Sequence, residues 1–258
     1  MTNFKELWAY REMIYSLVRR DLRGRYKGSA LGFAWTFINP LLQLAVYTMV
    51  FSIIMRNGIK DYYLYLFVAL IPWLFFSSCV SGSGGCIRGQ ADMVKKIYFP
   101  RAVIPISYTT SNFVNMLLSL IVVFAVVIIS GKTINIKAIC LLPLIMIIEY
   151  FICLGITLLI SAIAVFMRDI EYVMGIIAMA WQFATPVMYG LESVPVALVP
   201  YFNLNPMTPV IIAYRDILYY GQVPELQTLA SAIAFGGILT IIGFIVFEKL
   251  QKRFVEEL

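Results

Sequence analysis

Long stretches with almost no charge are the feature that most constrains the fold of this 258-residue chain. Six of them hold 20 to 30 residues each, and a single charge, Glu149, interrupts one. About 20 apolar residues in a helix cross the roughly 30 Å of a bilayer core, and lipid tolerates backbone only when its hydrogen bonds are made internally. The sequence therefore predicts an all-α membrane protein with six transmembrane helices. The predicted spans are residues 29–55, 62–87, 102–131, 138–167, 172–191 and 226–247.

Composition excludes a water-soluble domain. Hydrophobic residues make up 61% of the chain and charged residues 13%, about half the usual charged share. The segments between the spans are too short for a catalytic or nucleotide-binding domain, so any energy source must come from outside this chain. The chain has no histidine, the commonest general base, which weighs against a membrane enzyme. Gly131-Lys132-Thr133 ends like a phosphate loop, but Val126 occupies the first glycine position and favours a helix end.

The distribution of basic residues predicts the orientation. Fifteen of the 20 lysines and arginines fall on the side that holds both termini, and Arg56, Lys60, Lys132, Lys137 and Arg215 fall on the other. The positive-inside rule places both termini in the cytoplasm. Because no exposed domain carries these charges, we expect anionic lipid headgroups and no nucleic acid as their partners.

Residues 1–28 are predicted to form a cytoplasmic amphipathic interface helix ahead of the membrane domain, residues 29–258. One helical face gathers Phe4, Leu7, Trp8, Ile14, Tyr15, Val18 and Leu22, and most of the charged residues lie opposite. Arg11 and Arg25 fall near the apolar face and weaken the pattern.

Two connecting segments are unusual. Residues 193–214 are uncharged and apolar yet hold four prolines, which predicts a re-entrant helical hairpin buried in protein or lining a cavity; a tight apolar cap is the alternative. Residues 88–101 alternate charged and apolar side chains before Pro100, which favours a short docking helix over a solvated connector.

These pieces resemble the permease subunits of bacterial type-2 ABC polysaccharide exporters, which move O-antigen, capsule and teichoic acid. The resemblance covers nearly the whole chain. It is carried by RRDLRGRY at 19–26, LGFAW at 31–35, Asn39-Pro40, VKKIYFPR at 94–101, FMRDI at 166–170 and NLNPMTP at 203–209.

The resemblance implies a homodimer in the bacterial inner membrane that binds two cytoplasmic ATPase subunits. The substrate it implies is a glycan on an undecaprenyl diphosphate lipid. ATP and magnesium would belong to the partner subunits, and this chain would hold no cofactor, no metal and no catalytic residue.

Aromatic side chains suggest the substrate channel, because flat rings bind the apolar faces of sugars without demanding one hydrogen-bond pattern. Phe33, Phe37, Tyr47 and Phe51 share one face of the first predicted span, and Trp73 and Trp181 are further candidates. Ordinary packing or anchoring at the membrane surface is the alternative for each.

Three further groups of residues complete the predicted sites. Clustered cations favour phosphate oxygens, so the basic residues before the first span are candidates for diphosphate binding, with topological anchoring as the alternative. The ATPase-coupling and gate groups follow from the two unusual segments and from the turn after the fourth span. The groups are Arg23, Arg25 and Lys27 for the diphosphate, Asp92, Lys95, Lys96, Tyr98, Phe99, Arg168 and Asp169 for coupling, and Asn203, Asn205, Pro206 and Pro209 for a re-entrant gate.

Other functions remain open at this point. An ABC exporter for a drug or small lipid would share the six spans. A secondary transporter would show internal repeats and intramembrane charges beyond Glu149, and a membrane enzyme would show converging catalytic side chains.

Overall fold

The computed structural model describes residues 4–25, 27–54, 58–132 and 135–258, and every regular element within these ranges is a helix. Five helical segments are long and apolar enough to cross a membrane, which confirms the all-α membrane class. They are Gly32–Ser52, Tyr62–Cys86, Val103–Ile129, Ile136–Phe166 and Leu226–Arg253. Some expectations fall outside the described residues: the end of the first span at Met55, Arg56 of the charge count, Tyr26 of the motif and Thr133 after Lys132.

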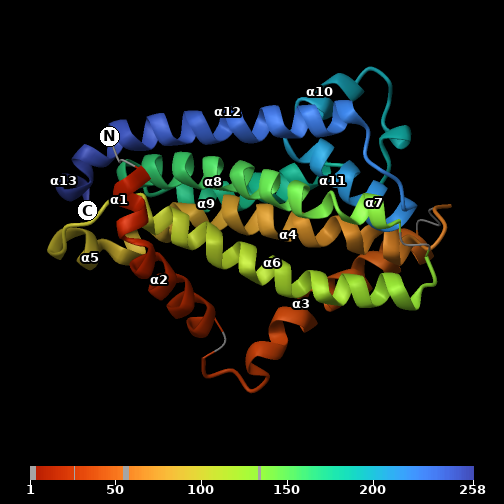
Figure 1. Cartoon of the computed structure of the whole chain (residues 1–258), viewed down its shortest axis with the longest axis horizontal. Coiled ribbons are helices and arrows are strands. Elements are labelled where there is room, and N and C mark those ends of the chain that lie inside the picture. Colours follow the sequence, from red (N-terminus) through yellow and green to blue (C-terminus); the bar gives the residue numbers. More distant parts are fainter. Residues whose placement is uncertain (1–3, 26, 55–57, 133–134) are drawn as a thin grey trace.

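Helix α4 (Tyr62–Cys86) is the centre of the bundle. It is hydrophobic on all sides, as expected of a helix surrounded by others, and most of its residues are buried. Helices α3 (Trp35–Thr48), α6 (Val103–Ile129), α8 (Leu142–Phe166) and α9 (Ile170–Phe183) pack on it. Helix α12 (Leu226–Leu250) packs along α8 as an outer layer (Figure 1).

The long helices run side by side, so the bundle has two distinct ends (Figure 1). Both chain termini and the short α5 (Ala91–Lys96) lie at one end, which we call the termini end, and α7 (Ile136–Ile139) lies at the other. The remaining elements are the 3-10 helices η1 (Gly32–Ala34), η3 (Arg88–Gln90), η4 (Leu191–Ser193) and η6 (Gln251–Arg253), the π-helices η2 (Met49–Ile54) and η5 (Asp216–Tyr220), and the short helices α10 (Val199–Asn203), α11 (Met207–Arg215) and α13 (Phe254–Glu257).

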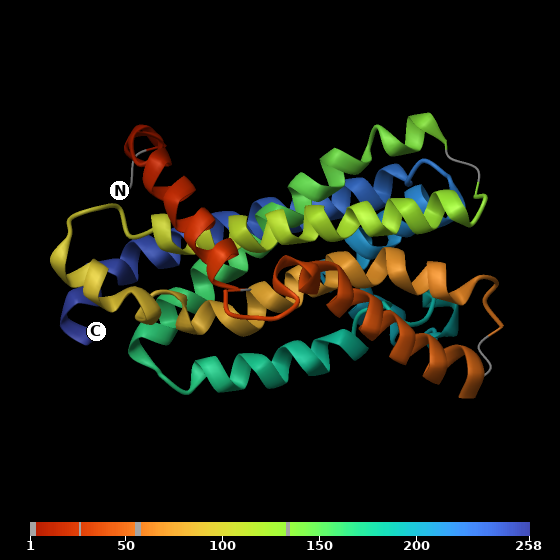
Figure 2. The ribbon, with the colours of Figure 1, turned by 90° about the horizontal axis from the view of Figure 1, so that it is seen from below.

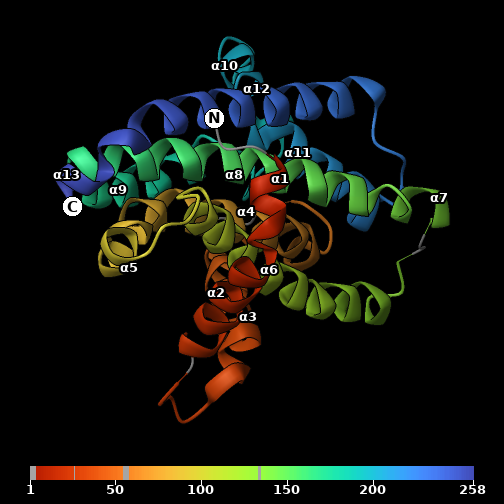
Figure 3. The same ribbon diagram turned by 60° about the vertical axis from the view of Figure 1, so that its left-hand side comes forward.

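The N-terminal segment forms two helices, α1 (Phe4–Ala9) and α2 (Arg11–Gly24), where the sequence predicts one. Helix α2 packs on α6. Helices α2 and α3 form a V beside the bundle (Figure 1), lie in front of it when the molecule is seen from below (Figure 2), and project from it in Figure 3. The predicted apolar face is divided. Leu7 and Ile14 pack against the core at the termini end, whereas Trp8 and Tyr15 are 71% and 62% exposed.

Helix α9 ends at Phe183, short of the span predicted for residues 172–191. With 14 residues it is about 21 Å long and does not cross a bilayer core alone. The chain beyond α9 contains Pro186, which has no backbone N–H to continue the helix. The carbonyls of Pro186, Val187 and Tyr189 accept hydrogen bonds from the Arg215 side chain in place of helical backbone donors.

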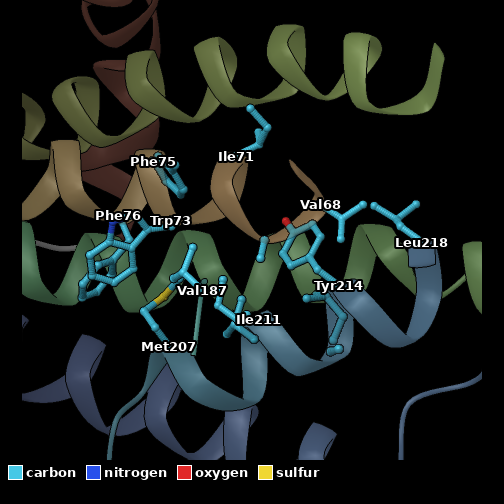
Figure 4. Packing of buried hydrophobic residues seen from close by; sticks show 14 of the residues in the cluster. Val68, Ile71, Trp73, Phe75, Phe76, Val187, Met207, Ile211, Tyr214 and Leu218 are labelled. Atoms are coloured by element: carbon cyan, nitrogen blue, oxygen red, sulfur yellow. The ribbon is translucent and has the colours of Figure 1, made fainter. Parts of the chain in front are cut away.

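The proline-rich segment forms the two short helices α10 and α11, separated by residues 204–206. Nearly all of α11 is buried. Its Met207, Ile211 and Tyr214 side chains point toward α4, where Val68 and Phe76 lie (Figure 4). The predicted break at the prolines is therefore present, and α11 is part of the core.

Helices α8 and α12 approach closely at two glycines. A Cβ atom on Gly243 would lie 2.4 Å from the carbonyl oxygen of Gly155, and one on Gly155 would lie 2.4 Å from the carbonyl carbon of Leu239. Small residues at such a contact let membrane helices pack backbone to backbone.

Candidate functional site

A large apolar groove with a basic rim runs along α2. Its volume is about 980 Å³, and its floor includes Ile14, Val18 and Phe33. Arg23 and Lys27 of the predicted diphosphate group both line it. The groove combines an apolar floor with cations, the two features that an anionic lipid requires.

Arg25 does not join the other two cations. Its guanidinium turns toward the bundle, where Nη2 donates to Oδ1 of Asn112 at 2.9 Å and to Oδ2 of Asp21 at 3.0 Å. Its Nε also donates to Asp21, at 3.1 Å. The structure thus divides the predicted diphosphate group between an outer groove and an inner position.

The predicted aromatic stripe follows η1, α3 and η2. Phe33 is 52% exposed and meets Phe37 edge to face, with ring centroids 5.5 Å apart. The hydroxyl of Tyr47 accepts a hydrogen bond of 3.3 Å from Nε2 of Gln182 on α9. Phe51 lies 6.2 Å from the ring of Tyr62 at the start of α4. The stripe is therefore open at Phe33 and packed against neighbouring helices farther along.

Trp73 and Trp181 lie elsewhere. Trp73 is 1% exposed and packs on Phe76 inside the bundle. The ring of Phe76 in turn meets Trp181 edge to face at 5.0 Å. Trp181 therefore joins α9 to α4 through Phe76, and Trp73 is buried beside Phe76 on α4.

Helices α3 and α9 bury few of their residues and present exposed apolar side chains, as the outer helix α12 also does. Few residues of α3 are buried, and Ala178 is the buried residue of α9. The exposed side chains include Leu42 and Val46 on α3, Met49 at the start of η2, and Tyr172, Ile176, Met179 and Phe183 on α9.

The segment predicted to couple to an ATPase protrudes at the termini end. Lys95 and Lys96 are exposed, Asp92 lies 3.9 Å from Lys96, and Tyr98 is 87% exposed. Phe99 differs, because its side chain is 5% exposed and packs in the core beneath. Arg168 and Asp169, in the turn between α8 and α9, are both exposed.

The predicted gate residues are mostly buried. Nδ2 of Asn205 donates to the carbonyl of Ala184 at 3.0 Å and to Oγ1 of Thr185 at 2.8 Å. Its Oδ1 accepts from the backbone nitrogen of Met207 at 3.0 Å, which satisfies a free donor at the start of α11. Pro206 and Pro209 are buried, and Asn203 is exposed. Asn205 therefore fixes α11 to the end of α9.

Sequence reasoning missed Arg215, which it counted as an outer charge. The side chain is 4% exposed, and its guanidinium donates to Pro186 and Val187 carbonyls at 2.6 Å each and to Tyr189 at 3.2 Å. It also stacks 3.7 Å from the ring of Tyr65. The sequence feature that could have indicated a buried Arg215 is its position as a single arginine at the end of an apolar run, next to tyrosines.

Comparison with known proteins gives the family. The model of the ABC-2 type transporter family matches residues 12–219. The O-antigen export system permease protein RfbA of Myxococcus xanthus is 33% identical over 256 residues, 98% of each chain. RfbA of Klebsiella pneumoniae is 30% identical over 95% of this chain and 94% of its own. The polysialic acid transport protein KpsM of Escherichia coli is 22% identical over 93% of each.

A match across four-fifths of the chain, together with relatives that align along almost its full length, agrees with the helical bundle described above. The chain belongs to the ABC-2 type transporter family.

Proposed function

We propose that this protein is the membrane permease subunit of an ATP-driven polysaccharide exporter. Its substrate is a glycan linked to undecaprenyl diphosphate, of the O-antigen, teichoic acid or capsule type, moved from the cytoplasm across the inner membrane. The observation that carries the proposal is the full-length similarity, at 33% identity, to a permease named for O-antigen export. The match to the family model alone would not identify the substrate, because proteins of one membrane fold transport many different substrates.

We infer that the termini end faces the cytoplasm. The basic residues of the N-terminal helices, the α5 segment and the C-terminal helix gather at that end. In this topology α9 and the chain that follows it complete a sixth crossing, and α10 and α11 re-enter from the outer side. Helix α2 with its basic residues then lies at the inner membrane surface.

The functional unit in this proposal is a homodimer. The exposed apolar faces of α3 and α9 need a covering, and in a polytopic protein this is lipid or another copy of the chain. A dimer that pairs these faces places the exposed Phe33 ring beside the path between the protomers. Aromatic rings along that path let a polymer slide past without a fixed hydrogen-bond pattern.

ATP hydrolysis belongs to separate subunits that bind at the termini end. The exposed Lys95, Lys96 and Tyr98 offer them a docking surface, and Arg168 and Asp169 extend it. Because Val94 and Phe99 anchor this segment in the core beneath, a push on it reaches the membrane helices. The cations of the groove along α2, Arg23 and Lys27, attract the substrate diphosphate.

Deleting the gene and locating the lipid-linked polysaccharide tests the proposal. We expect polymer trapped inside the inner membrane, loss of surface glycan, and rescue by the intact gene. Unchanged surface glycan would contradict polysaccharide export and favour a drug or small-lipid exporter of the same family. A strain that lacks an ATPase subunit gives the matched control, because it should show the same trapped polymer.

A further inference from the structure

A second cavity lies between α3, α4 and α6, and polar side chains dominate its lining. Its volume is about 210 Å³. At about 30 Å³ per water molecule it would hold roughly seven waters, and it is smaller than the 300 Å³ or so of an ordinary ligand pocket. A single sugar ring or phosphate fits such a volume, and a polymer does not. Polar residues that line it include Thr36, Asn39, Gln43, Ser78, Asn112 and Ser119.

The position of this pocket makes its polarity costly. Asn112 stands nine residues into the apolar α6, about 14 Å along the helix, and is 4% exposed. Ser119 is 3% exposed, and its hydroxyl reaches the carbonyl of Thr36 at 3.3 Å. Asn112 also donates to the carbonyl of Tyr108 at 2.9 Å, and Ser119 donates to that of Asn115 at 3.0 Å. Polar side chains at membrane depth bond neighbouring helices or line the path of a polar substrate, so several of them around one cavity make a candidate binding site.

One hydroxyl beside the pocket is unsatisfied. Thr36 is 2% exposed, and its Oγ1 has no hydrogen-bond partner within the described chain. A buried hydroxyl without a partner costs about 1–3 kcal/mol. A ligand that brings polar groups into the pocket would relieve that cost.

Arg25 lines both this pocket and a larger cavity of about 670 Å³, whose lining also includes Gln90, Tyr108 and Glu171. Its side chain is 25% exposed and is held by Asp21 and Asn112. A guanidinium between two cavities can bind a phosphate group bidentately when it exchanges Asp21 for the ligand.

We propose that this polar pocket binds the sugar-phosphate headgroup of the lipid-linked glycan, with Arg25 on the phosphate and the amides of Asn39, Gln43 and Asn112 on the first sugar. Amide groups donate and accept, which matches the hydroxyl and acetamido groups of a sugar. The Trp35 and Phe75 rings in the same lining offer apolar faces to the sugar ring. This inference rests on the proposed export of a lipid-linked glycan.

Binding to the purified full-length permease in lipid nanodiscs tests the pocket directly. Three probes separate the parts of the ligand: farnesyl diphosphate carrying one N-acetylglucosamine, farnesyl diphosphate alone, and N-acetylglucosamine 1-phosphate. We expect the sugar-bearing lipid to bind about tenfold more tightly than farnesyl diphosphate, since one or two added hydrogen bonds give that factor.

Two pocket variants should weaken the sugar-bearing probe. Gln43→Leu and Thr36→Val should each lower its affinity about tenfold and leave farnesyl diphosphate unchanged. The matched control is Thr157→Val on α8, because Thr157 is also fully buried with an Oγ1 that lacks a partner in the described residues, and it does not line the pocket. Its affinities should equal those of the wild type.

Equal affinity of wild type and pocket variants for the sugar-bearing probe would overturn the proposal. So would N-acetylglucosamine 1-phosphate binding as tightly as the lipid probe, because the ligand would then be a soluble sugar phosphate. Surface glycan in the deletion strain is an independent readout. If polymer is trapped in that strain but the pocket variants bind the sugar-bearing probe as tightly as the wild type, the proposed pocket is wrong and the proposed export function still holds.

Discussion

The hydroxyl of Tyr214 donates a hydrogen bond of 2.7 Å to Oε2 of Glu149, which joins the buried helix α11 to the first half of α8. Both residues are fully buried. A charged carboxylate at this depth costs about 3 kcal/mol, and Oε1 of Glu149 has no partner among the described side chains. This hydrogen bond therefore fixes the position of α11 against α8.

Glu149→Gln should leave export near the wild-type level, because a glutamine oxygen still accepts the Tyr214 hydroxyl. Tyr214→Phe should instead destabilise the permease by about 1–3 kcal/mol, since it leaves Glu149 buried without its donor. Thermal unfolding of the purified variants and surface glycan in complemented cells measure the two effects. Loss of export in a stable Glu149→Gln protein would show that ionisation of this carboxyl is needed for transport.

Arg215→Lys should destabilise the region around α11 by about 3 kcal/mol, although it keeps the charge. The guanidinium donates to three carbonyls in residues 186–189, and an ammonium cannot reproduce this planar fork. Thermal unfolding measures the loss. Arg253→Lys is the control, because Arg253 is exposed. A similar loss of stability in that variant would contradict the conclusion that the Arg215 hydrogen bonds stabilise this region.

Gly243→Ala should lower the unfolding temperature, because its methyl group would meet the Gly155 carbonyl at 2.4 Å and force α8 and α12 apart. Gly237→Ala on the same helix is the control, since no described atom lies within 4 Å of its added Cβ. That substitution should be neutral or stabilising by up to about 1 kcal/mol. Equal unfolding temperatures for the two variants would contradict the close contact.

The sequence predicted the parts of the fold that hydrophobic patterning controls. Charge-free stretches marked the long helices, and the prolines marked the break between α10 and α11. Patterning failed at α9, where the apolar run continues to Leu191 but the helix ends at Phe183. The carbonyls beyond it bond to Arg215, and no local rule predicts a partner 26 to 29 residues away.

The same limit applies to the sites. Arg23, Arg25 and Lys27 occupy alternate positions in the sequence and were grouped by charge, yet Arg25 points inward to Asn112, 87 residues away. Val94 and Phe99 share a short segment with Tyr98, but they face the core while Tyr98 faces outward. Which side of a segment meets the bundle depends on tertiary packing.

Tyr98→Ala and Phe99→Ala should therefore have different effects. Tyr98 is 87% exposed, so its removal should weaken binding to the ATPase subunit without changing thermal stability. Removing the buried Phe99 ring should cost about 3–5 kcal/mol of stability. Co-purification with the ATPase and thermal unfolding separate the two effects.

A cysteine in place of Tyr98 should also crosslink to the ATPase, and one in place of Ile129, exposed near the opposite end, should not. Capture from Ile129 and not from Tyr98 would reverse the docking assignment.

Asp216, at the start of η5, should make stability depend on pH. Burial, and then the nearby Glu225 carboxylate, raise the pKa of Asp216 from 3.8 to about 6. Because the folded-state pKa lies above that of the unfolded chain, ionising this group disfavours the native state. Its contribution to stability is fully present below about pH 4 and is lost as the pH rises through about 6.

Asp216→Asn removes this titration. The unfolding temperature of the variant minus that of the wild type should therefore increase between pH 4 and pH 7 and then level off. Glu257→Gln, which removes an exposed carboxylate near the C-terminus, is the control against which the pH dependence of Asp216→Asn is compared. A difference for Asp216→Asn that does not change with pH would mean that the half-buried carboxyl titrates alike in the folded and unfolded chain.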